Sequence, residues 1–242
     1  MNRFLKIGAI VVIAIGTICF LIRFSYHKAI TYYPEFYRER IEIAEEKLEQ
    51  DAKDFVFSSG RMLNDIRRKK EWSATYTEDQ INGWLERRIQ QDLPGLIPIG
   101  AYYPRVHLEQ DRINFAMEFC PEDFESVFWA QVRFTVPEPG VYHLIIEQVK
   151  LGVIPISKGI IKNELKNYFE KANIPCEIKM TDKGEIELVM DWRDIDSVND
   201  WKTDPLIYHS RKVTLTEVKI LPGEIQVSGT AKKVIIDRKS VV

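Results

Sequence analysis

The chain has 242 residues, of which 45% are hydrophobic and 29% are charged, a composition typical of a globular protein with one sizeable core. Its 34 basic and 36 acidic side chains give a net charge of -2, so there is no broad positive field and a nucleic-acid partner is not expected. The three cysteines contain no C-x-x-C pair, so neither zinc nor another cofactor is expected. Cys120 and Cys176 could form a disulfide or remain two buried thiols.

The N-terminal segment is predicted to be a transmembrane helix. No charged residue lies between Ile7 and Ile22, and apolar residues beyond Lys6 and Arg23 extend the stretch to the roughly 20 residues that span a bilayer. A cleavable signal peptide is the alternative, but no small-x-small cleavage site follows the stretch. We therefore predict an uncleaved, single-pass signal-anchor, whose flanking charges do not decide its orientation.

An amphipathic helix is predicted from Tyr37 to Lys70. The segment contains no proline, and Ile41, Leu48, Phe55 and Met62 lie on one face at seven-residue intervals. The residues at the intervening core positions of this heptad pattern are mostly polar, which disfavours a self-paired coiled coil. The apolar stripe is expected to pack against the chain's own sheet.

A second, shorter helix follows, and then an unusual apolar segment. Thr77 and Gln80 form a capping box that predicts a helix ending before Pro94. The segment from Leu93 to Pro104 is rich in proline, glycine and large apolar residues, so it fits neither a regular helix nor a polar loop. It could wrap the core, line a ligand entrance or contact a membrane.

From Val106 onward the apolar residues alternate with polar ones, which predicts half-buried strands. A turn at 137–140 and hairpins at 182–184 and 222–224 connect these strands, and a helix is predicted from Ser157 to Ala172. The expected fold is α+β: a transmembrane helix, a long amphipathic helix, and a curved, antiparallel, meander-rich sheet with helices covering one face. The corresponding ranges are 1–30 for the anchor, 31–71 for the long helix and 72–242 for the β-rich soluble domain.

Residue types that usually carry chemistry are scattered along the chain. The aspartates of 191–200 lack the glycine and the final glutamate of an EF-hand, which favours a solvated loop over a calcium site. Acidic residues at 118–125, near Cys120, could supply an acid and a base, but a polar turn between strands is favoured. No nucleophile elbow, phosphate loop or dinucleotide fingerprint is present, so we do not predict an enzyme. Each histidine is separate in sequence from cysteine and other histidines: His27, His107, His143 and His209.

Two stretches, Trp72–Leu85 with its T-E-x-Q-x-N pattern and Val149–Ile156 with its L-G-x-I-P-I pattern, resemble the YpmS-like family of bacterial single-span envelope proteins. The resemblance implies an extracytoplasmic domain in the cell envelope and a relation to lipid-binding modules built on a curved sheet. The long helix at 37–70 departs from the family's plan.

A curved sheet crossed by a helix can enclose an apolar groove, and we predict one here. The leading hypothesis is a membrane-anchored, non-enzymatic module that binds a lipid-like apolar ligand or the bilayer surface. One alternative is an envelope scaffold or accessory subunit that binds a protein partner, and another is a hydrolase using the acidic residues near Cys120. The residues expected to line the groove or its lip are Trp84, Leu96, Ile97, Ile99, Tyr102, Tyr103, Ile154 and Ile156.

Overall fold

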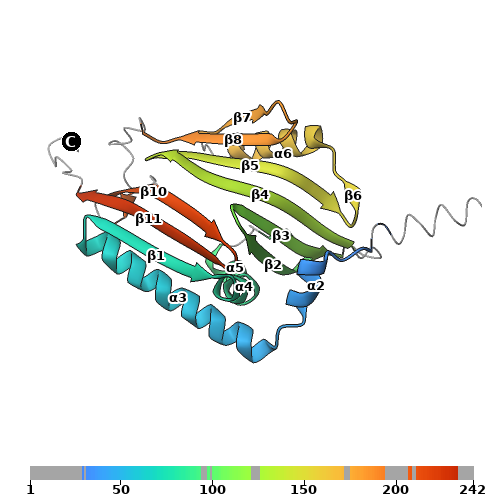
Figure 1. Ribbon diagram of the computed structural model, residues 1–242, viewed down its shortest axis with the longest axis horizontal. Coiled ribbons are helices and arrows are strands. Elements are labelled where there is room, and N and C mark those ends of the chain that lie inside the picture. Colours follow the sequence, from blue (N-terminus) through green and yellow to red (C-terminus); the bar gives the residue numbers. More distant parts are fainter. Residues whose placement is uncertain are drawn as a thin grey trace, which may run out of the picture.

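The chain folds as an α+β protein with two antiparallel sheets, as the computed structural model in Figure 1 shows. The predicted transmembrane segment at 7–22 lies outside the described residues. Among the helices that are described, none combines the length and apolar character needed to cross a bilayer. The structure describes residue 29 and residues 31–93, 97–98, 100–120, 126–171, 175–193, 207–208 and 211–233.

The long helix predicted from Tyr37 to Lys70 is wrong as one continuous element, because the chain bends at 42–44. Ile41 packs with Tyr37 against the large sheet, whereas Met62 packs against the small one. One straight helix could not reach both surfaces. The described helices are α2 (Glu35–Ile41), α3 (Glu45–Arg68), α4 (Glu78–Arg87), α5 (Ile89–Asp92) and α6 (Lys158–Lys171).

The small sheet joins early and late parts of the sequence in the order β1-β11-β10-β9. One face packs against α3, where Trp72, Ile66 and Ala231 form a buried cluster. Gly229 lies directly under the Trp72 indole, and a Cβ atom there would come within 2.4 Å of the ring. The strands are β1 (Glu71–Thr77), β9 (Ile207–Tyr208), β10 (Arg211–Leu221) and β11 (Glu224–Lys233).

The large sheet is a meander in its first four strands and has the order β2-β3-β4-β5-β8-β7, with β6 paired to β5. β2 begins at Ala101, so part of the segment predicted to be irregular is a strand. The strands are β2 (Ala101–Glu109), β3 (Arg112–Phe119), β4 (Ser126–Glu138), β5 (Val141–Leu151), β6 (Ile154–Pro155), β7 (Glu177–Met180) and β8 (Ile186–Asp191).

Helices cover both faces of the large sheet, and not one face as predicted. Alternate residues of a strand point to opposite faces. Met117 packs with α4, and Phe128 packs both with this α4 cluster and with the cluster under α6. The intervening residues Ala116 and Val127 pack with Tyr37 of α2 on the other face. The N-terminal helix α2 therefore lies on the opposite face of the sheet from α6, whereas α4 also contacts α2 at the edge strand β2, where Arg40 and Glu78 form an ion pair.

Two helical glycines provide a matched test of how closely α3 and α4 pack. A Cβ atom on Gly83 of α4 would come within 2.6 Å of the Ala52 nitrogen in α3, whereas a Cβ atom on Gly60 of α3 would meet nothing within 4 Å. We expect Gly83→Ala to lower the free energy of unfolding by roughly 1–3 kcal/mol through overpacking. Gly60→Ala should raise it by about 0.5–1 kcal/mol. Urea unfolding of the full chain in detergent micelles measures both, and equal effects would contradict the close packing at Gly83.

Candidate functional site

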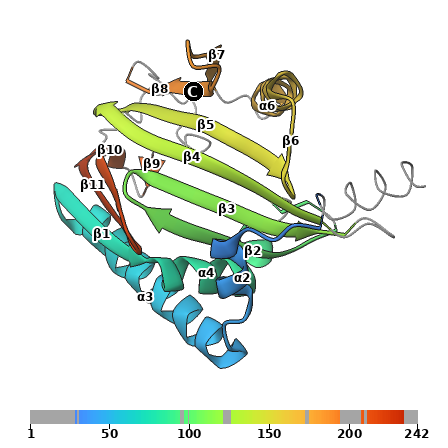
Figure 2. The same cartoon turned by 45° about the vertical axis from the view of Figure 1, so that its right-hand side comes forward.

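Strand register brings several strand ends together at one edge of the large sheet. Ala101 pairs with Phe119, and Phe119 pairs with Ser126 on the next strand. The Val153 N–H donates to the Ala29 carbonyl at 2.8 Å, so the chain emerging from the predicted anchor is hydrogen-bonded to this edge. Figure 2 shows the ends of β2, β3 and β4 that meet at this edge, with α2 beside them. The Ala29 edge is defined here as Ala29 with residues 101–103, 118–119, 126–128 and 151–154.

Tyr37 fixes α2 against the Ala29 edge. Its side chain is completely buried, and its hydroxyl donates to the Tyr103 carbonyl at 3.0 Å. Burial, and to a lesser degree the charge of Glu118, raises the pKa of Tyr37 far above its ordinary value. The hydroxyl therefore remains a protonated donor throughout the physiological pH range. In addition, the Phe36 ring packs edge-on against Trp129 of β4, with centroids 6.4 Å apart.

An ion-pair network centred on Glu78 holds the same helix. Glu78 is buried at the start of α4, forms an ion pair with Arg40 of α2 and lies 3.0 Å from His107 Nδ1. Its second oxygen accepts the Leu108 backbone N–H at 2.6 Å. Because breaking a buried pair leaves an uncompensated charge, this network strongly favours one position of α2.

Arg105 makes a second polar connection between α2 and α4. Its side chain is 1% exposed, and its Nη1 atom lies 2.7 Å from a carboxylate oxygen of Glu86 in α4. Its Nε donates to the Arg40 carbonyl near the C-terminal end of α2 at 3.0 Å. Arg40 thus contributes both its side chain and its backbone to the connection. The two networks together fix the segment that follows the predicted anchor.

The T-E-x-Q-x-N pattern is structural in each of its named positions. Thr77 and Gln80 form the predicted capping box, with bonds of 3.1 and 3.2 Å. Asn82 is fully buried and binds both the N–H and the carbonyl of Val106, at 2.7 and 3.0 Å. Glu78 and Asn82 therefore bind the outer backbone groups of edge strand β2, as a neighbouring strand would.

Large apolar side chains remain exposed at and beside the Ala29 edge. Tyr102 and Tyr103 are 53% and 47% exposed, Val153 is 45% exposed, and Tyr32, three residues after Ala29, is 42% exposed. Tyr103 has a φ of 50° within a β-bulge, a conformation that costs a non-glycine residue of order 1–3 kcal/mol. The bulge redirects the tyrosines relative to a regular strand.

Two pockets lie near α2 and α4, and the smaller one includes residues of the Ala29 edge. One, of about 440 Å³, lies beside α2 and has aromatic walls from Tyr32, Phe36 and Trp129, while Arg40, His107 and three glutamates supply its charged and polar groups. The other, of about 200 Å³, is lined by polar and apolar atoms of α4, α5 and the start of β2. Its lining residues are Leu85, Glu86, Ile89, Gln90, Ile97, Ala101, Tyr102, Tyr103 and Pro104.

The predicted groove residues fall into three groups. Ile97, Tyr102 and Tyr103 line the smaller pocket, and Trp84 packs with the same core cluster but points its indole N–H to Asp92 at 2.8 Å. Ile154 lies at the Ala29 edge, while Ile156 packs in the cluster that includes residues of α6. Leu96 and Ile99 lie outside the described residues.

The other residues that could carry chemistry lie partly within and partly outside the described part of the chain. His143 lies 3.0 Å from Glu187, and Asp191 pairs with Arg193. No disulfide joins Cys120 and Cys176. In the described part of the chain, no group of three or more histidine, cysteine or acidic residues could hold a metal ion. The remaining acidic candidates at 121–125 and 194–200 lie outside it.

No protein-family model, curated protein or solved structure matches the chain. The resemblance to the YpmS-like family therefore stays a prediction.

Asn82 offers a direct test of how α4 seals β2. Asn82→Ala removes both partners of Val106 and leaves a buried N–H and carbonyl unpaired, so we expect the free energy of unfolding to fall by roughly 2–4 kcal/mol. Gln80→Ala on the same helix disturbs only an exposed cap and should cost below about 1 kcal/mol. Urea denaturation compares the two, and a similar small loss in both would refute the sealing role.

Proposed function

We propose that this protein is a membrane-anchored, non-enzymatic module whose Ala29 edge binds the bilayer surface. The observation that carries the proposal is the hydrogen bond between Ala29 and Val153, because it brings the exposed tyrosines to the end of the domain nearest the predicted anchor. Ala29 follows Ile22 by seven residues, so the edge lies within about 25 Å of the end of the predicted span even for a fully extended connection.

The residue types at the edge suit an interface between lipid and water. Tyrosine rings combine an apolar body with a polar hydroxyl and concentrate at the level of lipid headgroups. Tyr32, Tyr102 and Tyr103 are all more than 40% exposed, and Val153 adds an exposed aliphatic group. Lys150 lies 4.6 Å from the centre of the Trp129 ring and supplies a positive charge at the end of β5. The proposal places the domain outside the cytoplasm, as the family resemblance implies.

Because α2 is held rigidly on the sheet, contact between the Ala29 edge and the membrane costs little conformational entropy. If α2 were a flexible tether, ordering the domain on the membrane would cost conformational entropy at each encounter. The bonds of Tyr37, Arg40 and Arg105 hold α2 on the sheet in advance. Insertion of a few aromatic rings can then add to the affinity supplied by the anchor.

A lipid-like ligand held inside the domain is less well supported. The pocket that contains Ile97, Tyr102 and Tyr103 has a volume of about 200 Å³, below the roughly 300–1,000 Å³ of typical small-molecule sites. It could accept the end of one acyl chain at the bilayer surface. A complete lipid would need the described elements to move apart.

A protein partner is the second candidate, supported by α3. Phe57 is 67% exposed and Val56 is 43% exposed on the helix that packs against the small sheet. Exposed apolar residues on a helix are common at protein interfaces. This surface is separate in sequence from the Ala29 edge and serves as a control below.

Depth-dependent quenching tests the membrane proposal. The full chain, with its native cysteines replaced by alanine, is labelled with a fluorophore at Tyr102→Cys, Val153→Cys or Phe57→Cys and reconstituted in vesicles that contain nitroxide-labelled lipid. We expect strong quenching at 102 and 153 and little at 57, because only the first two lie at the Ala29 edge. Equal quenching at all three positions would contradict the proposal. A co-purified lipid detected by native mass spectrometry, together with weak quenching at 102, would favour an internal ligand.

A further inference from the structure

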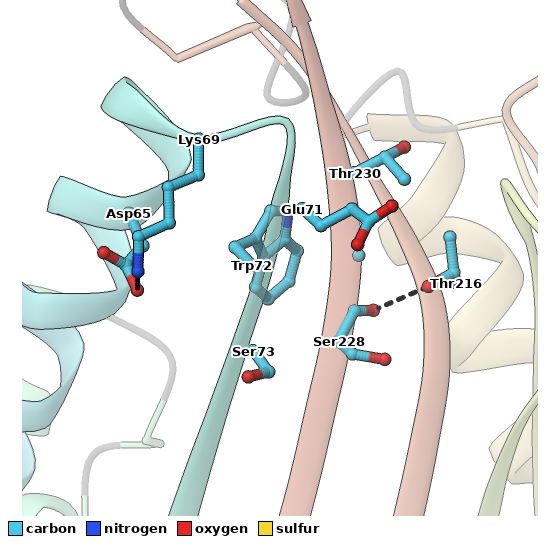
Figure 3. A pocket seen from close by; sticks show the side chains of 9 residues that line it. Asp65, Lys69, Glu71, Trp72, Ser73, Thr216, Ser228 and Thr230 are labelled. Carbon is cyan, nitrogen blue, oxygen red and sulfur yellow. Dashed lines mark hydrogen bonds and ion pairs between the residues drawn. The ribbon is translucent and has the colours of Figure 1, made fainter.

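The face of the small sheet opposite α3 carries several hydroxyl groups and the carboxylate of Glu71, whose register partner is Thr230. Strand alternation sends Val213 toward α3 and Thr214 to the other side, where its register partner is Thr230. Figure 3 shows Thr230, Thr216 and Ser228 around the pocket on this part of the hairpin, with the Thr216 hydroxyl donating to the Ser228 carbonyl at 3.2 Å. Thr230 also lines a second pocket, nearer the ends of the strands.

Two lysines lie directly opposite each other at this second pocket. Lys212 of β10 pairs in register with Lys232 of β11, two residues beyond the Thr214 and Thr230 pair and on the same face. Like charges at directly opposed positions destabilise a sheet. Among the described carboxylates, none forms an ion pair with either lysine. The repulsion is therefore not relieved by the described part of the chain.

The pocket that contains these lysines has a volume of about 310 Å³ and lies between the two sheets. The side chains with polar atoms that line it are cationic, hydroxyl-bearing or, for Trp192, an indole N–H donor, and no carboxylate is among the described lining residues. The Trp192 Nε1 atom is buried and has no hydrogen-bond partner in the described structure. The lining residues are Pro139, Gly140, Tyr142, Trp192, Arg193, Lys212, Thr214, Thr230 and Lys232.

Arg193 is held in place beside the lysines. It forms ion pairs with Asp191, at 2.6 Å, and with Glu138 of β4. Hydrogen bonds from Arg193 lower the pKa of Asp191 to about 2, so this carboxylate is ionised at every physiological pH. The charge of Arg193 is thus largely neutralised, whereas the charges of Lys212 and Lys232 are available to a ligand.

From the opposed lysines, the hydroxyl groups and the unpartnered indole N–H, we propose that this pocket binds a phosphate group. A tetrahedral oxyanion can accept hydrogen bonds from several directions, and its negative charge would relieve the repulsion between the two ammonium groups. A carboxylate offers fewer acceptor directions to the same donors. The phosphate site itself is independent of the membrane-binding function proposed for the Ala29 edge, and only the source of the phosphate, given next, rests on that function.

The position of the pocket indicates where the phosphate comes from. Pro139 and Gly140 follow the far end of β4, whose 13 residues begin at the Ala29 edge. A strand of that length spans about 40 Å, well beyond the headgroup layer of a bilayer that contacts the Ala29 edge. With the Ala29 edge on the bilayer, as proposed above, the ligand is a soluble or polymeric phosphate ester and not a lipid of the host membrane.

Isothermal titration calorimetry with inorganic phosphate tests the site on the full chain in phosphatidylcholine nanodiscs, with empty nanodiscs as the blank. We expect saturable binding that weakens by roughly tenfold or more in the Lys212→Gln/Lys232→Gln double variant. Lys233→Gln removes one charge from the neighbouring position of β11 but on the other face, so its affinity should match the unmodified chain. Lys232→Arg keeps the charge and should retain binding.

A melting measurement separates loss of binding from loss of fold. Without phosphate, Lys232→Gln should melt at the same temperature as the unmodified chain or higher, because the repulsion with Lys212 is gone. Phosphate should raise the melting temperature of the unmodified chain and of Lys233→Gln, but not of the double variant. Absence of phosphate binding, equal loss in Lys233→Gln, or binding to phosphatidylglycerol vesicles alone would each overturn the proposal.

Discussion

The largely buried ion pairs of Arg40 and Arg105 determine how the domain is placed relative to the chain that precedes it. Each arginine connects α2 to another element, Arg40 through Glu78 and Arg105 through Glu86. Charges that are taken out of water must keep their partners, so α2 cannot slide or rotate without leaving one of them unpaired. The packing of Tyr37, the bond from Val153 to Ala29 and the exposure of the tyrosines at the Ala29 edge all depend on that fixed helix.

The two proposed surfaces use different properties of the sheets. At the Ala29 edge, aromatic side chains are exposed where strand ends meet, which suits a broad and fluid contact such as a bilayer. At the other end, Lys212 and Lys232 are held by strand register, which suits a compact ligand with several acceptors. Because β4 extends from one region to the other, the sheet serves as a rigid spacer between them.

Local sequence patterns predicted most of the elements correctly. The capping box of Thr77 and Gln80, the hairpins at Gly184 and Gly223, and the period of two along β3 and β4 need only neighbouring residues, and the structure confirms them. Both of those glycines adopt positive φ, which explains the strength of the turn signals.

Features that depend on distant partners could not be predicted. At the bend after α2, Arg105, which is far away in sequence, donates a hydrogen bond to the Arg40 carbonyl. Glu78 and Asn82 have the spacing of an ordinary helix surface, and only the position of β2 beside α4 gives them their role. The Lys212 and Lys232 pair likewise requires a strand register that includes a bulge between Leu215 and Glu217.

The pairing of β1 with β11 has a consequence for biosynthesis. Trp72 lies opposite Gly229, so the strand that follows α3 finds its partner only when almost all of the described chain has been made. Local hairpins such as β3 with β4 can form much earlier. During synthesis, α3 and β1 are therefore made long before their partner strand, and their apolar face stays uncovered until the last hairpin completes the small sheet.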